Sequence, residues 1–166
     1  MEIKMVLHLP RDAVSVPICR QVLNSCLETL GVTPDTRGDI ALALSEACAN
    51  VVLHAGPGEE YEVQVRAEDR KCVIEVVNAG RLDGGKTPDA YGLDGELSEG
   101  LALTDLPVPA TAERGRGLKI IDAVTENLQL SGNQRHGTTV HFEKTLEWLP
   151  EAAGRQLLNA DDGAGH

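Results

Sequence analysis

The fold of this chain is decided by the stretch ALSEACANVVLHA, residues 43–55. It places Glu46, Asn50 and His54 at strict four-residue intervals within an otherwise apolar run. At about 100° per residue, these three side chains share one stripe of a helix. The neighbouring stripe is apolar and is expected to pack into a core. Its members are Ile40, Leu44, Ala47 and Val51. One acid and two neutral polar groups beside a buried stripe are typical of a pocket wall, so we predict a functional site here.

The composition indicates a globular, acidic chain of one domain. Of its 166 residues, 42% are hydrophobic, which is enough to bury a sizeable core. The formal charge of −11 would repel phosphate backbones and anionic lipid surfaces. Aromatic residues, which could stack on bases, make up only 2% of the chain. We therefore expect neither nucleic acid nor a membrane as a partner.

The N-terminus and the cysteines indicate a cytoplasmic protein. The first residues lack the cationic segment and the long apolar stretch of a secretory signal. No apolar run approaches the roughly 18 residues that a membrane span needs. The four cysteines form no CxxC pair and are expected to be buried free thiols rather than disulfides or metal ligands. They are Cys19, Cys26, Cys48 and Cys72.

Helical and alternating periodicities divide the chain into short elements. A helix is expected to start at Ser15, whose hydroxyl would cap it, and to end at Gly31. A second helix would carry the polar stripe from about Thr33 to Ala55. The other predicted elements are strands at 2–9, 61–67, 72–78, 128–133 and 138–146 and a short helix at about 118–125. Residues 79–115 are rich in Gly, Pro, Asp and Glu without a period, which is typical of a lid or a disordered segment.

Three further motifs place ligand-binding groups at the ends of predicted elements. The first is VVNAG, residues 76–80, where a strand ends in a carboxamide that is followed two residues later by glycine. The second is ERGRGLKII, residues 113–121, where glycines open into a helix and expose backbone N–H groups to an anion. The third is GTTV, residues 137–140, at the start of the last strand. Alone, each is also typical of an ordinary turn, connection or strand start.

Together and in this order, the four elements resemble the nucleotide-binding boxes of the gyrase and histidine-kinase ATPase superfamily, the Bergerat fold. The forms ALSEACAN, GRGLKII and GTTV look most like the anti-sigma serine kinases of bacterial partner-switching systems, over roughly residues 5–146. This resemblance implies an α/β (α+β) two-layer sandwich, in which helices cover one face of a mixed, mostly antiparallel sheet. It also implies an ATPase domain at 1–148, with an ATP lid at about 80–115 and a flexible tail at 149–166.

The resemblance assigns chemistry to the helix and to the glycine-rich motif. Asn50 would bind Mg²⁺ through its amide oxygen, a suitable ligand for a hard cation that keeps several waters. Glu46 would act as general base toward a serine hydroxyl or water. Arg114 would contact the γ-phosphate, and Gly115 and Gly117 would let the lid close around the phosphates. Arg116 and Leu118 complete the expected nucleotide-binding residues of this segment. His54 is expected either to touch nucleotide or to form a structural hydrogen bond at the helix end.

The resemblance also assigns a base-binding wall, at which this chain departs from the family. Gly80 would permit close approach of the adenine ring, and Thr138 or Thr139 would assist at the base. Relatives usually have aspartate at the position of Asn78, where it accepts a hydrogen bond from the adenine amino group. Asparagine keeps an acceptor oxygen but loses the charge, and a loss of about 1.4 kcal/mol corresponds to a tenfold weaker affinity. We therefore expect Asn78 to bind ATP more weakly than aspartate would.

The resemblance implies a cytoplasmic homodimer that regulates transcription in a stress response. Such a protein sequesters a sigma factor and phosphorylates an anti-anti-sigma partner on serine, converting Mg-ATP into ADP. The alternative is a non-catalytic anti-sigma binding module with a weakened or lost ATP site, which Asn78 and the long acidic lid favour. A third possibility is a free-standing ATPase or a sensor-kinase fragment. The lack of a helix pair with a phosphoacceptor histidine argues against it.

Overall fold

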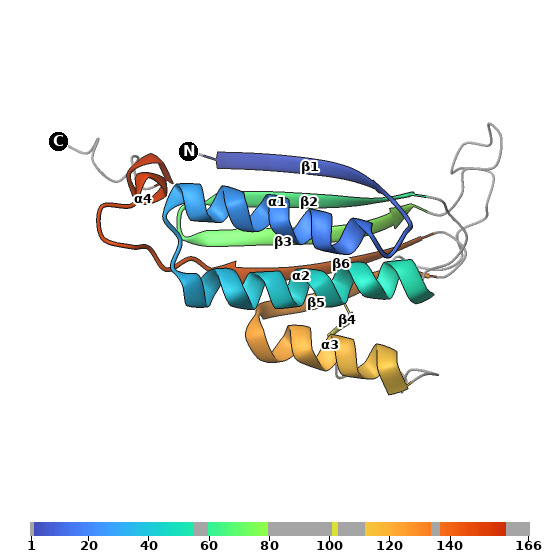
Figure 1. The fold of residues 1–166 in the computed structure, drawn as a ribbon. Coiled ribbons are helices and arrows are strands. Elements are labelled where there is room, and N and C mark those ends of the chain that lie inside the picture. The colour runs from blue at the N-terminus through green and yellow to red at the C-terminus, as the bar shows by residue number, and fades with distance from the viewer. Residues whose placement is uncertain (1, 55–59, 80–100, 103–111, 134–136, 159–166) are drawn as a thin grey trace, which may run out of the picture.

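The structure, a computed structural model of the chain, describes residues 2–54, 60–79, 101–102, 112–133 and 137–158 (Figure 1). Its elements are β1 (Glu2–Pro10), α1 (Ser15–Leu30), α2 (Pro34–His54), β2 (Glu60–Glu68), β3 (Lys71–Ala79), β4 (Leu101–Ala102), α3 (Ala112–Val124), β5 (Glu126–Asn133), β6 (Gly137–Thr145) and α4 (Ala153–Leu158). None of the described helices is both long enough and apolar enough to cross a membrane.

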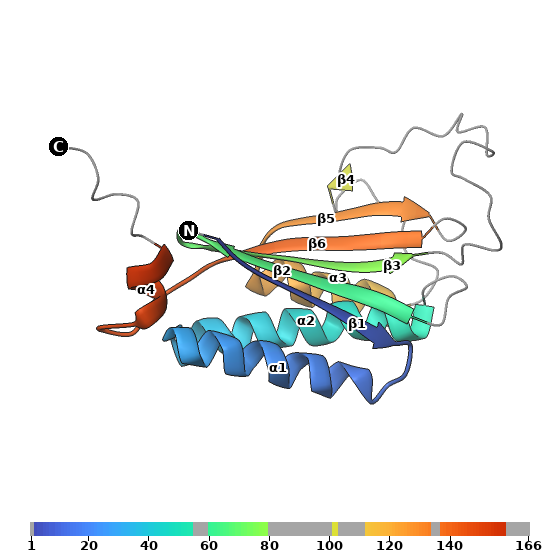
Figure 2. The same cartoon turned by 90° about the horizontal axis from the view of Figure 1, so that it is seen from above.

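The described strands form one six-stranded sheet in the order β1-β2-β3-β6-β5-β4. Helices α1, α2 and α3 cover one face of this sheet, and the other, open face is covered by no described helix (Figure 2). Along the strands, buried apolar side chains alternate with side chains that point away from the helices. On β2, for example, Val63 and Val65 are buried while Gln64 and Arg66 point outward. The predicted two-layer α+β sandwich is confirmed. Where a mixed sheet was expected, every pairing among the described strands is antiparallel.

Helix α2 supplies the centre of the core. Its apolar side packs toward β3 and β6, whose inward side chains include Ile74 and Phe142, both fully buried. The predicted stripe is confirmed, since none of its members is more than 2% exposed: Ile40, Leu44, Ala47 and Val51. Burying a side chain of this size stabilises the fold by about 1.5–3 kcal/mol for the larger members. The polar stripe of α2 is therefore fixed at the border of the best-packed part of the molecule.

Helix α1 has the expected bounds but not the expected N-terminal cap. The Ser15 hydroxyl does not cap the helix; it donates to the Asp12 carbonyl oxygen at 2.6 Å and lies 2.6 Å from the Tyr61 hydroxyl. The Asp12 carboxylate instead accepts a hydrogen bond from the Val14 backbone N–H at 2.9 Å. Gly31 ends the helix as predicted, in the left-handed conformation with φ 84°.

Helix α3 begins at Ala112, about two turns earlier than predicted, so Gly115 and Gly117 lie inside the helix rather than ahead of it. Ala, Glu and Arg at 112–114 are good helix formers, whereas each glycine costs about 1 kcal/mol. Burial of Leu118 (5% exposed) and Ile121 (0%) offsets that cost. Of the predicted lid, residues 80–100 and 103–111 lie outside the described residues, and β4 between them pairs with β5.

Part of the segment predicted as a flexible tail is folded. Trp148 forms an isolated bridge with Val32, and α4 then packs beside the C-terminal end of α1 (Figure 1). Leu158 is fully buried, and Gly154 leaves no room for a side chain, because a Cβ there would lie 2.5 Å from Trp148 Cζ3. Helix α4 lies at the opposite end of the sheet from the C-terminal end of β3.

Three of the four thiols are buried as predicted, and all four are free. Cys26 is the exception, because it faces solvent from the outer side of α1. Burial raises the pKa of Cys72 to about 12. The pKa of Cys48 is also raised, through its contact with Cys19 and through burial.

Candidate functional site

The polar stripe of α2 faces α3 at the position of a glycine. A Cβ added to Gly117 would lie 3.0 Å from Glu46 Oε2 and 3.6 Å from both Oδ1 and Nδ2 of Asn50. Glu46 and Asn50 are both partly buried, while the adjoining Ala47 is fully buried. Two motifs that are far apart in the sequence are thus in contact, and the glycine allows the α3 backbone to approach the acid and the amide.

The neighbours of Gly117 differ in where they point. Gly115 is partly exposed and lies in the first turn of α3. Arg116 is exposed. Leu118, which was expected among the nucleotide-binding residues, packs its side chain into the core. Its contribution to a site at α3 is therefore to anchor the helix against the sheet.

Asn78 is a buried polar residue near the end of β3. Strand β3 alternates, so its side chain extends the inward row of Ile74 and Val76, and it is only 1% exposed. Neither Oδ1 nor Nδ2 makes a hydrogen bond to any residue that the structure describes. Leaving a buried polar group unpaired costs about 1–3 kcal/mol, so an amide in this state points to a missing partner. A ligand that offers both a donor and an acceptor would supply it.

Strand β6 places one of the two predicted threonines beside Asn78. Thr138 is directly opposite Asn78 in the antiparallel register, and Thr139 is opposite Val77. Directly opposed residues share a face of the sheet, so Thr138 lies on the helix-covered face with Asn78. Thr139 lies on the open face, which separates it from the carboxamide. Of the two threonines, only Thr138 can assist at a ligand held by Asn78.

The elements that carry the described candidate residues meet at one end of the fold. Strand β3 ends, β6 begins and α3 begins at the same end of the sheet, toward which α2 also runs (Figure 1). Gly80 lies outside the described residues. The backbones of His54 and Arg114 belong to α2 and α3, and their side chains lie outside what the structure describes.

The residues at this end fit a purine nucleotide with a hard cation. The unpaired Asn78 amide offers a donor and an acceptor, which is the pattern that an asparagine uses to read a purine edge. Asn50 offers an amide oxygen, and Mg²⁺ commonly takes one or two protein ligands and completes its shell with waters and phosphate oxygens. Within the described ranges, no group of three His, Cys, Asp or Glu side chains could hold a metal ion.

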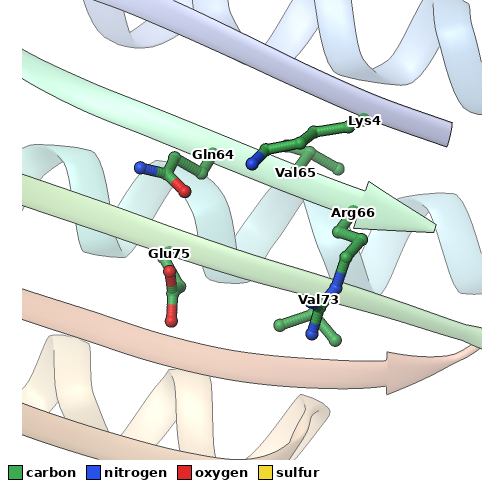
Figure 3. Close-up of a pocket in the computed structure, with 6 residues that line it drawn as sticks. All are labelled: Lys4, Gln64, Val65, Arg66, Val73 and Glu75. Atoms are coloured by element: carbon green, nitrogen blue, oxygen red, sulfur yellow. The ribbon is translucent and has the colours of Figure 1, made fainter. Parts of the chain in front are cut away.

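A groove elsewhere on the molecule is not part of this site. It lies on the open face of the sheet, where side chains from β1, β2 and β3 converge (Figure 3). The residues that line it are Lys4, Gln64, Val65, Arg66, Val73 and Glu75. Because Glu75 and Asn78 point to opposite faces of β3, the sheet separates the groove from the carboxamide.

The contact between Gly117 and Glu46 could not be found from the glycine-rich motif alone, because the motif predicts a helix that starts only after the glycines. The sequence carries one signal for it. The stretch from Ala112 to Ile121 contains no proline, and its apolar residues 118 and 121 are spaced three apart, which is typical of a helix whose small residues can face a neighbour.

Comparison with known proteins identifies similar sequences over most of the chain. The model of the histidine kinase-like ATPase domain matches residues 9–144. A serine-protein kinase RsbW of Bacillus velezensis is 31% identical over 145 residues, which cover 84% of this chain and 84% of the relative. A serine-protein kinase RsbW of Bacillus cereus is 28% identical over 147 residues, which cover 87% of this chain and 86% of that relative.

A solved structure has a similar fold. It contains the RsbU and RsbW domains of a Mycobacterium tuberculosis protein and superimposes with a TM-score of 0.57 at 17% identity. The match covers 86% of this chain but only 32% of that longer protein. At this identity, the similarity concerns the fold alone.

Proposed function

Because the chain belongs to the histidine kinase-like ATPase domain family, and within it to the RsbW-type serine-protein kinases, we propose that it phosphorylates an anti-anti-sigma protein on serine and sequesters a sigma factor. The chain is a protein-serine kinase. The observation that carries the proposal is the contact of Glu46 and Asn50 with Gly117, at the end of the sheet where the Asn78 amide is unpaired.

The α2 residues divide the chemistry between them. Glu46 is the general base that accepts the proton of the attacking serine hydroxyl, and the buried residues on either side of it hold its backbone in place. Asn50, one turn later, holds Mg²⁺ through its amide oxygen. Bound Mg-ATP supplies the phosphoryl group that is transferred. The close approach of α3 at Gly117 limits the space around the acid, so water is partly excluded from it.

The remaining residues bind the two ends of the nucleotide. Asn78 and Thr138 contact the base, and Gly80 allows the base to approach the backbone. Arg114 contacts the γ-phosphate. Gly115 leaves the first turn of α3 free of a side chain beside the phosphates, and Arg116 adds a positive charge at the same end.

The relatives support the proposed partners. Both Bacillus relatives are named serine-protein kinases, and the Mycobacterium structure joins an RsbW domain to an RsbU domain. We propose that the protein acts in the cytoplasm as a homodimer and exchanges a sigma factor for an anti-anti-sigma protein. Phosphorylation of the second partner, with release of ADP, returns the kinase to the sigma factor.

The proposal is tested by phosphate transfer from labelled Mg-ATP to purified anti-anti-sigma candidates. Glu46→Gln is expected to lower transfer at least about 100-fold, in line with the loss of a general base, while ATP binding is kept. The matched control is Glu28→Gln on α1, where a 63% exposed carboxylate lies 3.7 Å from Arg37. It should leave transfer unchanged. ATP binding with no transfer to any candidate, together with intact binding of a sigma factor, would show a non-catalytic anti-sigma module instead.

A further inference from the structure

We propose that the base subsite at Asn78 accepts guanine as well as adenine, so that the protein binds GTP with an affinity close to that for ATP. This inference rests on the proposed function, because it concerns the nucleotide site of the kinase. It adds a property of the site, namely which purines it admits, and assigns that property to one side chain.

The orientation of the Asn78 amide is not fixed by the protein. The oxygen and nitrogen of a carboxamide exchange places when the group turns by 180°, and hydrogen-bond partners normally hold one of the two orientations. Here both atoms are buried and neither makes a hydrogen bond. The side chain can therefore present its acceptor or its donor to a ligand without breaking any bond to the described chain.

The residues around the amide do not select an orientation either. Thr138, opposite Asn78, carries a hydroxyl that can both donate and accept. The next pair inward on the same face is Val76 and Val140, which are apolar and buried. Within the described part of this row, no charged group favours the donor or the acceptor end of the carboxamide.

The two purines differ in the groups that such an amide would meet. Adenine presents a donor at N6 and an acceptor at N7, whereas guanine presents acceptors at O6 and N7. A carboxamide matches adenine with its oxygen toward N6 and its nitrogen toward N7, and it matches guanine by donating to O6 or N7. On the edge of the base that carries N7, a carboxylate has only acceptors to offer, so it matches N6 of adenine and opposes O6 of guanine. Asparagine at this position thus removes discrimination that an acid would impose.

Binding measurements with the full chain test the inference directly. Titration calorimetry with ATP, GTP and inosine triphosphate in Mg²⁺ is expected to give dissociation constants within about tenfold of one another. Inosine triphosphate carries the oxygen at position 6 but lacks the 2-amino group of guanine, so it isolates recognition of O6. Asn78→Asp is expected to shift the ratio of the GTP and ATP constants toward ATP by at least about tenfold, equivalent to about 1.4 kcal/mol.

Two further variants separate selectivity from general damage to the site. Asn78→Leu removes both the donor and the acceptor, so it should weaken ATP and GTP by the same factor. Asn24→Asp is the matched control, because Asn24 Oδ1 accepts a hydrogen bond from Arg37 at 3.3 Å and an aspartate can keep it. This variant should change neither constant. Thermal melting of each variant reports whether the fold is intact. The ratio of the GTP and ATP dissociation constants of the wild type tests, without any variant, whether the site admits both purines.

The outcomes distinguish the inference from the function on which it rests. ATP binding with GTP and inosine triphosphate weaker by about 100-fold or more would overturn the inference and leave the kinase assignment standing. An Asn78→Asp variant that folds and keeps the wild-type ratio would also overturn it. If the wild-type chain binds none of the three nucleotides, both the inference and the proposed function are wrong.

Discussion

Gly117 of α3 lies so close to Glu46 of α2 that a Cβ on the glycine would be 3.0 Å from the Glu46 Oε2 atom. Few Cβ atoms in proteins make so short a contact, and the nearest atom here is the end of a side chain that can rotate. The separation of the two helices is thus set by the absence of a side chain at residue 117. Activity should depend on this glycine more than stability does.

We predict that Gly117→Ala lowers phosphate transfer about 10- to 100-fold while the protein remains folded. The methyl group would push the Glu46 carboxylate by a few tenths of an ångström, and small misplacements of catalytic groups reduce rates steeply. Single-turnover transfer measures the loss, and a melting curve within a few degrees of the wild type shows that the fold is kept.

Gly38→Ala is the matched control for this variant. Gly38 also lies within a helix, but a Cβ there would meet nothing within 4 Å. Alanine at an open helical position should raise the free energy of unfolding by about 0.5–1 kcal/mol and leave transfer unchanged. Equal losses of activity in the two variants would contradict a specific role for the Gly117 contact.

A second prediction concerns the folded segment beyond β6. Leu158→Ala should lower the free energy of unfolding by about 2–5 kcal/mol, because the side chain is 0% exposed and its removal leaves a cavity. The adjacent Leu157 is 42% exposed, so Leu157→Ala should change stability by no more than about 0.5 kcal/mol. Chemical denaturation of both variants makes the comparison, and equal effects would mean that α4 does not pack in solution.

The strands and the central helix could be predicted because their apolar residues recur at the regular spacing of a strand or of a helix. Alternation located β1 and β2 to within a residue or so, and the apolar stripe around Leu44 predicted the buried face of α2. Helix α4 could not be predicted in the same way, since its six residues are too few to show a period. It depends on Trp148 and on the end of α1, which are contacts that only the folded chain brings together.

A third prediction concerns acid stability. Lys71 donates to Glu143 at 2.6 Å on the open face, and this bond lowers the pKa of Glu143 from its ordinary value of 4.5. A carboxylate with a lowered pKa stabilises the folded state above its unfolded pKa, and this stabilisation disappears as the pH falls through the folded pKa. The difference in unfolding free energy between the wild type and Glu143→Gln should therefore shrink below about pH 4.5.

A double-mutant cycle provides the control for this effect. In a Lys71→Met background, the largest cause of the lowered pKa is gone, so Glu143→Gln should show a smaller change with pH. Urea titrations at several pH values measure each difference. The same pH dependence with and without Lys71 would mean that the ion pair is not its cause.

A fourth prediction concerns the thiols. Cys26 is exposed, whereas Cys72 is buried and has its pKa raised to about 12. In the folded protein, a thiol reagent at neutral pH should modify one cysteine quickly, and Cys26→Ser should remove that fast phase. Denaturant should make all four accessible. More than one fast phase in the native protein would show that the α1–α2 packing opens readily.

The family was predictable, and the resemblance to the anti-sigma serine kinases is confirmed at the level of the family. The faces of the sheet were harder to assign. Thr138 and Thr139 are chemically identical in the sequence, and only the register against Asn78 separates them. Likewise, Leu118 follows the glycines directly but points into the core, because α3 starts earlier than its glycines suggested.

Helix α2 is at once the carrier of the proposed catalytic groups and the most deeply embedded helix of the described fold. Ala43, Leu44, Ala47 and Cys48 are all 0% exposed, so the backbone that bears Glu46 is held on both sides of the acid. Local opening of such a segment costs nearly as much as global unfolding. The backbone at Glu46 is therefore expected to stay in place during turnover, and the serine would have to be brought to the proposed base. We expect the pace of the reaction to be governed by how a partner protein delivers its hydroxyl, rather than by rearrangement of the kinase around it.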